Sequence, residues 1–384
     1  MKVSTAIRLE SIKEYYFSKK LREVAGLIQA GKPILNMGIG SPDLPPHPSV
    51  TEALHGAMTH PRANMYQSYQ GLPELREAMA NFYDRHYSVS LDPSSEILPL
   101  MGSKEGIMHI SMAFLNKGDE VLIPNPGYPT YSAVTQLVEA SPVFYNLSNT
   151  TNWQPDFEAL EALDTSKIKL MWLNYPHMPT GAKADRETLK KLIQWAAKEE
   201  ILLINDNPYS FILNNEPQSI LSLPGAKAVT MELNSLSKSF NMAGWRVGML
   251  SGNTENIQAV LKVKSNMDSG MFYGIQQGAI AALNAPDSWF SALNATYKKR
   301  RKLVEELATL MNATFDPNSV GMFVWAKLND STLAAETYID QILYEKDIFI
   351  TPGTIFGSQG EGYIRFSLCV NEDQIRTAIN RMKA

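Results

Sequence analysis

The chain has 384 residues, of which 44% are hydrophobic and 19% charged, a composition typical of a globular protein with one large domain and a smaller one. Its 35 basic and 39 acidic side chains leave a formal net charge of -4, which gives no positive field for nucleic acid. The single cysteine, Cys369, excludes an internal disulfide and a cysteine-based metal cluster.

The first twenty residues are charged and lack the apolar core of a signal peptide. No run of eighteen apolar residues occurs in the chain, so we expect no membrane span and a cytoplasmic location. The six histidines show no metal-binding spacing, and we expect no metal site. A stretch rich in turn-forming residues, 38–48, marks the expected passage from an N-terminal arm, residues 1–45, into the large domain.

Residues 46–284 are expected to form this large domain, because short apolar runs alternate with longer helical ones over much of the segment. Several runs are apolar throughout, which is typical of strands covered by helices on both faces of a parallel sheet. Helices are expected over 104–115, 131–139, 185–199 and 255–264, the third with Asp185 near its start. The expected strands are 97–101, 120–123, 143–146, 169–174, 201–205, 229–233 and 246–251.

Residues 285–384 have a different pattern and are expected to form a small α+β domain. It begins with a long charged helix over 288–311, whose basic run 298–302 we expect to face solvent. A strand over 322–327, a helix over 334–346 and strands over 348–351 and 363–369 follow.

Polar residues follow several strands of the large domain, at the edge of an open α/β sheet where ligands bind. Ser103 and Lys104 open a helix, whose N-terminus favours an anion such as phosphate. Tyr128 lies on a loop bounded by prolines and could stack on an aromatic cofactor or fill the core. Asp206 and Tyr209 follow an apolar strand; a buried carboxylate there needs a cation, or it caps a turn.

The most informative segment is 234–246, in which Lys238 is flanked by serines and precedes Arg246 by eight residues. A lysine of this kind can form a Schiff base with pyridoxal phosphate (PLP), with Ser235 and Arg246 as donors to the phosphate. Arg365 lies among apolar residues near the C-terminus, where a planar guanidinium suits a substrate carboxylate or a structural ion pair.

Taken together, the chain resembles the class I/II PLP-dependent aminotransferases of fold type I, with most similarity to the LL-diaminopimelate aminotransferase branch. The resemblance covers nearly the whole chain and is strongest in the lysine segment with its upstream Asp206 and Tyr209. The remaining matching motifs are Gly40-Ser-Pro-Asp43, Tyr66, Gly71-Leu-Pro-Glu-Leu-Arg76, Gly102-Ser-Lys104, Pro126-Gly-Tyr128, Pro179-Thr-Gly181 and Arg365.

The resemblance implies a seven-stranded, mainly parallel sheet and a small domain built from both termini. It also implies roles for individual residues. Lys238 carries the cofactor and moves the substrate proton; Asp206 pairs with the pyridine nitrogen; Tyr209 reaches the ring oxygen; Tyr128 stacks on the ring; Ser103, Lys104, Ser235 and Arg246 surround the phosphate; Arg365 and Gly40 contact the substrate. A homodimer is implied too, in which Tyr66 reaches the neighbour's phosphate.

Met178 departs from the family pattern, because an asparagine that donates to the cofactor's ring oxygen usually stands there. Methionine has no hydrogen to donate. A hydrogen bond to a charged group contributes about 1.5–3 kcal/mol, so we expect a raised pKa of the internal aldimine unless His177 or Asn174 supplies the donor.

The expected reaction moves an amino group from an L-amino acid to a 2-oxo acid by a ping-pong mechanism. A carbon–sulfur lyase on the same fold and a non-catalytic PLP-binding regulator are the alternatives. Tyr15, Tyr16, Phe17 and Tyr273 indicate an aromatic or aliphatic substrate lining, without identifying the substrate.

Overall fold

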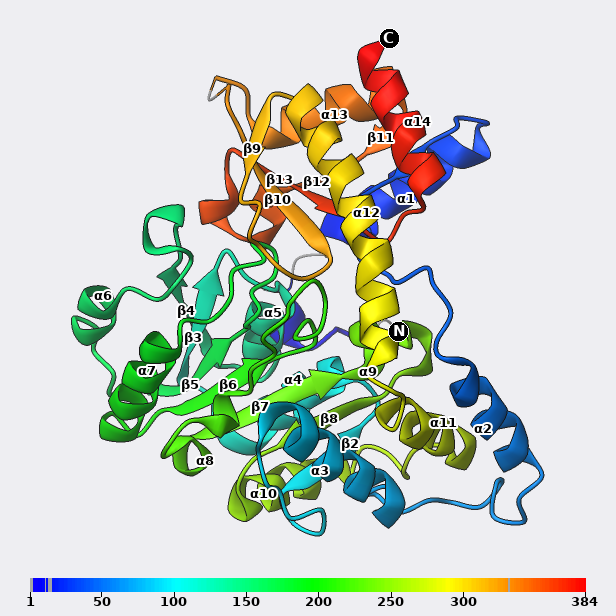
Figure 1. The fold of residues 1–384 in the computed structure, drawn as a ribbon. Coiled ribbons are helices and arrows are strands. Elements are labelled where there is room, and N and C mark those ends of the chain that lie inside the picture. The colour runs from blue at the N-terminus through cyan, green and yellow to red at the C-terminus, as the bar shows by residue number, and fades with distance from the viewer. Residues whose placement is uncertain (1–2, 11, 13–15, 331) are drawn as a thin grey trace.

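The computed structural model describes residues 3–10, 12, 16–330 and 332–384. Figure 1 shows a large sheet with helices on both faces, a smaller region that contains the C-terminus above it, and the long helix α12 running between the two. The predicted domain boundaries, after residues 45 and 284, stay a prediction. No helix in the described residues is long and apolar enough to cross a membrane.

The large sheet has seven strands in the order β2-β8-β7-β6-β5-β3-β4. All pairings among β3 to β7 are parallel, whereas β8 runs antiparallel to both of its neighbours, β2 and β7. The sheet is therefore mainly parallel, and every predicted strand of the large domain is present. The bounds are β2 Ile97–Leu100, β3 Glu120–Asn125, β4 Ser141–Asn146, β5 Ile168–Leu173, β6 Leu202–Asp206, β7 Thr230–Ser235 and β8 Gly248–Ser251.

Helices cover this sheet by burying one apolar face each. Helix α7 begins after Asp185, whose carboxylate accepts from the Thr188 backbone N–H at 2.8 Å, and it buries Leu192 and Ala196. The predicted cap is thus confirmed. The helices around the large sheet are α2 Pro48–Met58, α3 Pro73–Tyr87, α4 Ser103–Phe114, α5 Thr130–Leu137, α6 Phe157–Glu161, α7 Arg186–Lys198, α8 Ala226–Val229, α9 Leu236–Ser239, α10 Thr254–Lys264 and α11 Tyr273–Leu283.

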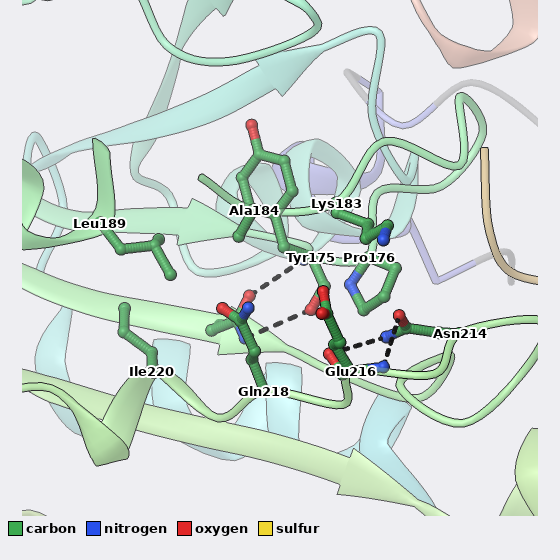
Figure 2. Close-up of a pocket in the computed structure, with 10 residues that line it drawn as sticks. Tyr175, Pro176, Lys183, Ala184, Leu189, Asn214, Glu216, Gln218 and Ile220 are labelled. Atoms are coloured by element: carbon green, nitrogen blue, oxygen red, sulfur yellow. Dashed lines mark hydrogen bonds between the residues drawn. The ribbon is translucent and has the colours of Figure 1, made fainter. Parts of the chain in front are cut away.

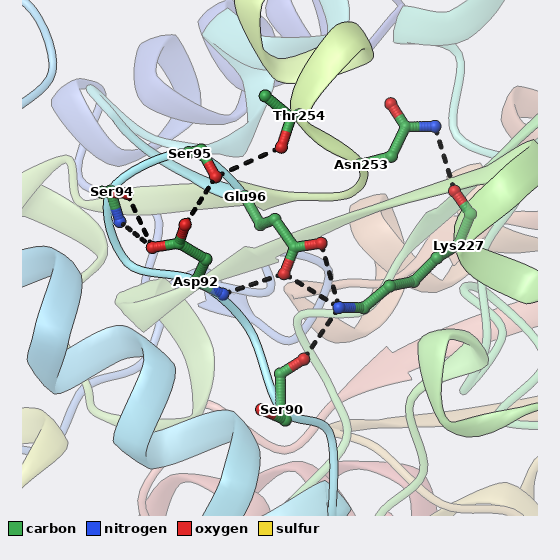
Figure 3. A network of polar contacts seen from close by, with 8 residues as sticks. All are labelled: Ser90, Asp92, Ser94, Ser95, Glu96, Lys227, Asn253 and Thr254. Carbon is green, nitrogen blue, oxygen red and sulfur yellow. Dashed lines mark hydrogen bonds and ion pairs between the residues drawn. The ribbon is translucent and has the colours of Figure 1, made fainter.

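A polar network secures the edge of the sheet at β2 (Figure 3). The ammonium of Lys227, from α8, lies 2.8 Å from the carboxylate of Glu96 and donates to the Ser90 carbonyl at 2.8 Å. Glu96 also accepts from the Asp92 backbone N–H at 2.8 Å. The loop that leads into β2 is thereby tied to the helix that precedes β7.

The smaller region contains a four-stranded antiparallel sheet in the order β12-β13-β10-β9. A separate two-stranded pairing joins β1 near the N-terminus to β11 in parallel. The bounds are α1 Tyr16–Gln29, β1 Leu35–Asn36, α12 Ser288–Leu310, β9 Ala313–Phe315, β10 Phe323–Leu328, α13 Ala335–Lys346, β11 Ile348–Phe349, β12 Thr351–Pro352, β13 Tyr363–Ser367 and α14 Glu372–Lys383.

Two expectations for the C-terminal region are wrong. The single strand predicted over 348–351 is two strands in two different sheets, because β11 pairs with β1 and β12 pairs with β13. The basic run of α12 is not uniformly solvated. Arg300, 2% exposed, makes a two-pronged contact with the Asp43 carboxylate at 2.7 and 2.8 Å, and Arg301 is buried against Ser319. Each buried guanidinium has found oxygen acceptors, as burial of a charge requires.

Candidate active site

A cavity of about 330 Å³ lies beyond the carboxyl ends of β6 and β7, next to the N-terminus of α4. This is the sheet edge at which the sequence predicted a ligand site. The cavity gathers Ser103, Lys104, Tyr128, Tyr131, Asn174, Met178, Asp206, Tyr209, Ser235, Lys238 and Arg246. Eight predicted cofactor-binding residues therefore come together from separate segments of the chain; the ninth, Tyr66, does not.

Asp206, at the end of β6, is the buried carboxylate of this cavity. The Tyr131 hydroxyl donates to its Oδ2 at 3.0 Å, while Oδ1 has no hydrogen-bond partner among the described residues. Burial raises the pKa of Asp206 to about 7, and the Tyr131 hydrogen bond opposes this rise. A buried oxygen of this kind fits a cationic N–H such as that of a pyridinium ring.

The opposite end of the cavity fits a phosphate. Ser103 and Lys104 form the first turn of α4, where backbone N–H groups point outward. Gly102 has φ 89°, and a Cβ there would lie 2.1 Å from Nη2 of Arg246, so only glycine admits the guanidinium. Ser235 caps α9 by accepting from the Ser237 N–H at 3.0 Å. Nη1 of Arg246 donates to the Ala243 carbonyl at 2.9 Å. The planar guanidinium suits two-pronged hydrogen bonds to phosphate oxygens.

Lys238 lies on α9, between these two ends. Its Nζ donates to the Gly40 carbonyl at 2.6 Å. Burial lowers its pKa below the usual range for lysine, and the positive charges of Arg365 and Arg246 lower it further. An amine that loses its proton readily is the form that attacks a carbonyl carbon.

A second cavity, of about 310 Å³, opens on the other side of Lys238. It shares Tyr128, Met178, Tyr209 and Lys238 with the first cavity and adds Gly40 and Arg365. The three predicted substrate-binding residues, Gly40, Tyr128 and Arg365, therefore line it together. The reactive lysine stands at the junction of the two cavities.

Arg365, on β13, is buried and held in one orientation. Its Nη2 donates to the Gly38 carbonyl at 2.8 Å, and Nη1 lies 3.4 Å from the sulfur of Met178. Its guanidinium carbon lies 3.9 Å from the ring centre of Phe323 and 4.6 Å from that of Phe356. A thioether is a weak acceptor, so a carboxylate oxygen can replace it at Nη1.

Other predicted residues lie elsewhere. Tyr66 is 91% exposed and lines neither cavity, so its predicted contact across a dimer stays a prediction. Tyr273 stacks on His60 with ring centres 4.8 Å apart and lines neither cavity of this chain, so its expected place in the substrate lining stays a prediction. Tyr15 and the side chains of Tyr16 and Phe17 are outside what the structure describes.

Sequence reasoning missed one residue of the cofactor cavity, Tyr131, and one ion pair that lines neither cavity, Asp43 with Arg300. Tyr131, the donor to Asp206, follows Tyr128 by three residues, and its ring stacks on Trp172 at 4.8 Å. Asp43 belongs to the Gly40-Ser-Pro-Asp43 motif, but the sequence predicts a solvated face for its partner, Arg300. A tyrosine one helical turn from a predicted ring-stacking residue was the available signal for Tyr131; no local signal identified the pairing of Asp43.

The sequence predicts no metal site. Glu105, His109 and Asp268 place three possible ligand atoms within 4.8 Å of one another. The ammonium of Lys264 lies 2.6 Å from Asp268, and Glu105 bonds His109 at 2.9 Å. Because Lys264 supplies positive charge beside these carboxylates, we propose no metal ion for them.

Another pocket lies under the loop that follows β5 (Figure 2). It is lined by Tyr175, Pro176, Lys183, Glu216 and Gln218 among others, and its volume is only about 20 Å³. Asn214 bridges the Ser210 and Glu216 carbonyls beside it. The space suits about one water molecule and is too small for a coenzyme.

The chain matches the family model for aminotransferase class I and II over residues 32–382. It is 37% identical over 378 residues to an LL-diaminopimelate aminotransferase of Aquifex aeolicus, covering 98% of this chain and 97% of that one. An enzyme of the same name from Dehalococcoides mccartyi is 39% identical with the same coverage.

Solved structures agree with this assignment. The apo structure of BacF from Bacillus subtilis superposes with a TM-score of 0.95 at 34% identity, covering 100% of this chain and 98% of that one. An aminotransferase from Staphylococcus aureus superposes with a TM-score of 0.89 at 31% identity, covering 98% of each chain. The chain belongs to the class I and II aminotransferase family. It is a PLP-dependent transferase of amino groups with the fold of that family, as the sequence predicted.

Proposed function

We propose that Lys238 is the residue that holds PLP covalently in this aminotransferase and that its amine, once released, moves the proton at the substrate Cα. The observation that supports this is its place at the junction of a cavity fitted for the cofactor and a cavity that contains Arg365. Lys238 lines both cavities, which suits a residue that moves a proton between a cofactor and a bound substrate.

The other residues bind and orient. Asp206 meets the ring nitrogen, Tyr209 donates to the ring oxygen, and Tyr128 covers the ring. The phosphate contacts come from Ser103, Lys104, Ser235 and Arg246. When bound, PLP supplies an electron sink that stabilises negative charge at the substrate Cα and carries the amino group between the two half-reactions.

Arg365 takes the substrate α-carboxylate, with Gly40 and Tyr128 alongside it. Its fixed guanidinium plane orients the substrate so that Cα lies toward Lys238. The reaction follows a ping-pong order, because the amino donor and the 2-oxo acid use the same cavity one after the other. The named relatives support transamination over a carbon–sulfur lyase or a non-catalytic regulator.

We propose a homodimer as well, in which Tyr66 reaches the phosphate of the neighbouring subunit. Its almost complete exposure beside the exposed Met65 supports a role at an interface. We also propose a cytoplasmic location, which a single, buried cysteine suits.

The test is turnover of a panel of amino acids with PLP, with and without pyruvate or 2-oxoglutarate. We expect conversion of the amino acid to depend on the added oxo acid. Lys238→Ala should lose this conversion, whereas Lys227→Ala, the control lysine variant, should retain it. Ammonia and a 2-oxo acid formed without an acceptor would show a lyase instead. An unchanged rate in Lys238→Ala would remove the assignment of the lysine.

A further inference from the structure

Glu105 is the third residue of α4 and directly follows Ser103 and Lys104, the proposed phosphate-binding residues. Its Oε2 accepts a hydrogen bond from the backbone N–H of Met101, on the strand side of the turn that leads into α4. Its Oε1 lies 2.9 Å from Nε2 of His109, one helical turn further along α4. Both carboxylate oxygens are therefore engaged, and Glu105 does not line the cofactor cavity.

The turn that Glu105 closes is packed tightly on the large sheet. A Cβ on Gly248 of β8 would lie 2.6 Å from the backbone nitrogen of Ser103, so β8 lies directly against the turn. A Cβ on Gly106 would lie 2.6 Å from leucine atoms of β2 and of β7, so α4 also approaches the sheet closely. The first N–H groups of a helix have no acceptor within it and are free to bind an anion, which makes the direction of this turn decisive for phosphate.

A carboxylate beside a phosphate site has an electrostatic cost, and the surroundings of Glu105 reduce it. The ammonium of Lys264, 1% exposed, lies 2.6 Å from Asp268, whose carboxylate is grouped with Glu105 and His109 within 4.8 Å. Burial acts to raise the pKa of Asp268, but the hydrogen bonds from Lys264 and from the Gly270 N–H outweigh it, so this pKa lies below its usual range. The buried ammonium therefore offsets carboxylate charge next to the turn.

We infer that Glu105 is a positioning residue for the phosphate of PLP. By accepting from the Met101 N–H, it holds the turn in the shape in which the N–H groups of Ser103 and Lys104 face the phosphate, and His109 in turn holds Glu105. The contacts that carry the inference lie within one subunit, between side chains that are at most 16% exposed. The inference rests on the proposed phosphate contacts of Ser103 and Lys104.

A glutamate in the first turn also stabilises a helix in general, and the experiment separates this effect from positioning. PLP and pyridoxal, which lacks the phosphate, are each titrated into the apoenzyme, with tryptophan fluorescence as the readout. The ratio of the pyridoxal Kd to the PLP Kd measures what the phosphate contributes. A general loss of stability or of subunit assembly changes both constants alike and leaves the ratio unchanged.

Glu105→Ala is expected to lower this ratio about tenfold or more, because PLP binding weakens while pyridoxal binding changes little. Glu105→Gln keeps an oxygen that can accept from the Met101 N–H, and its ratio should stay within about threefold of the wild type. Glu255→Ala is the matched control, because Glu255 is an exposed first-turn glutamate of another helix, α10. Its ratio should equal that of the wild type.

His109→Leu tests the same inference with Glu105 in place, and it serves if Glu105→Ala does not fold. Without its partner at Nε2, Glu105 should hold the turn less well, and the ratio should fall by about threefold or more. An unchanged ratio in both Glu105→Ala and His109→Leu would overturn the inference, and so would a glutamine variant as weak as the alanine variant. A wild type that binds PLP no better than pyridoxal would instead refute the proposed phosphate contacts, and the inference with them.

Discussion

The hydroxyl of Tyr131 donates to Oδ2 of Asp206 at 3.0 Å, inside a stack in which the tyrosine ring lies flat on Trp172. The stack fixes the direction of the hydroxyl, and the hydroxyl fixes one oxygen of the carboxylate. The second oxygen, Oδ1, has no hydrogen-bond partner among the described residues, and Asp206 lines the cofactor cavity. We therefore propose Tyr131 as a positioning residue, because its hydrogen bond stabilises the ionised form of Asp206, the carboxylate proposed to hold the cofactor ring.

Tyr131→Phe is expected to weaken PLP binding. Loss of a hydrogen bond to a charged group costs about 1.5–3 kcal/mol, which corresponds to a tenfold or larger rise in the dissociation constant of PLP. The measurement is a PLP titration of the apoenzyme followed by tryptophan fluorescence. Tyr145→Phe is the matched control, because the Tyr145 hydroxyl donates to the Trp172 carbonyl nearby and does not touch Asp206. Equal affinities in the two variants would contradict the role of Tyr131.

Asp206→Asn is expected to stabilise the cofactor-free protein at alkaline pH. The folded pKa of Asp206, about 7, lies above the value of an unfolded aspartate, so the folded state holds a proton that the unfolded state releases. The free energy of unfolding therefore falls as the pH rises from about 4 to about 7. Asparagine does not titrate, so the variant lacks this fall in the free energy of unfolding. Melting temperatures of the apo forms at pH 5 and pH 8 should show a larger gain for the variant at pH 8, and the same gain at both values would refute the explanation.

Met178→Asn is expected to lower the pKa at which the cofactor chromophore of the loaded enzyme changes, by about one to two pH units. Of the two residues considered as replacement donors, Asn174 uses its amide inside the protein and His177 lines neither cavity. The Asn174 amide donates to the Asp206 carbonyl at 2.6 Å, and His177 lies 2.9 Å from the Thr180 hydroxyl. The measurement is absorbance against pH, and Met178→Leu, which also lacks a donor, should titrate like the wild type. Identical titrations of the asparagine variant and the wild type would refute the proposed effect of Met178 on this pKa.

Asp43→Ala is expected to destabilise the fold by about 3 kcal/mol, because it leaves the buried guanidinium of Arg300 without its two-pronged partner. Glu372 approaches Arg300 only at 3.5 Å, on a different nitrogen. Urea unfolding gives the free energies. Lys299→Ala, on the exposed side of the same basic run, should change stability by less than about 0.5 kcal/mol. A similar midpoint for both variants would mean that the pair contributes little.

The large sheet could be predicted from the sequence because its strands carry their own signal. Runs such as Leu202–Asp206 are apolar enough to require burial on both faces, and the polar residues that follow them lie at the ligand edge by the rules of parallel sheets. The antiparallel direction of β8 could not be predicted, since the local pattern of a short apolar strand is the same in either direction.

The wrong predictions from the sequence involve contacts between residues far apart in the chain. Arg300 looks like a surface residue because its neighbours are basic, and its partner, Asp43, lies 257 residues away. Likewise, the sequence predicts one strand over 348–351, although residues 348–349 pair with β1 and residues 351–352 pair with β13. Short motifs pointed to most of the residues that line the two cavities, because each of those residue types has a chemical use. Their supporting residues, such as Tyr131, depend on packing that no local motif records.

The main chain just after β1 accepts hydrogen bonds from residues of both cavities. The Gly38 carbonyl receives a hydrogen bond from Arg365, and the Gly40 carbonyl receives one from Lys238. Only one residue, Ile39, lies between these two glycines. The preceding strand, β1, pairs with β11 in the smaller region. The residue proposed to bind the substrate carboxylate and the proposed catalytic amine thus hydrogen-bond to the same short segment of main chain. We therefore expect a displacement of this segment to change both hydrogen bonds at once.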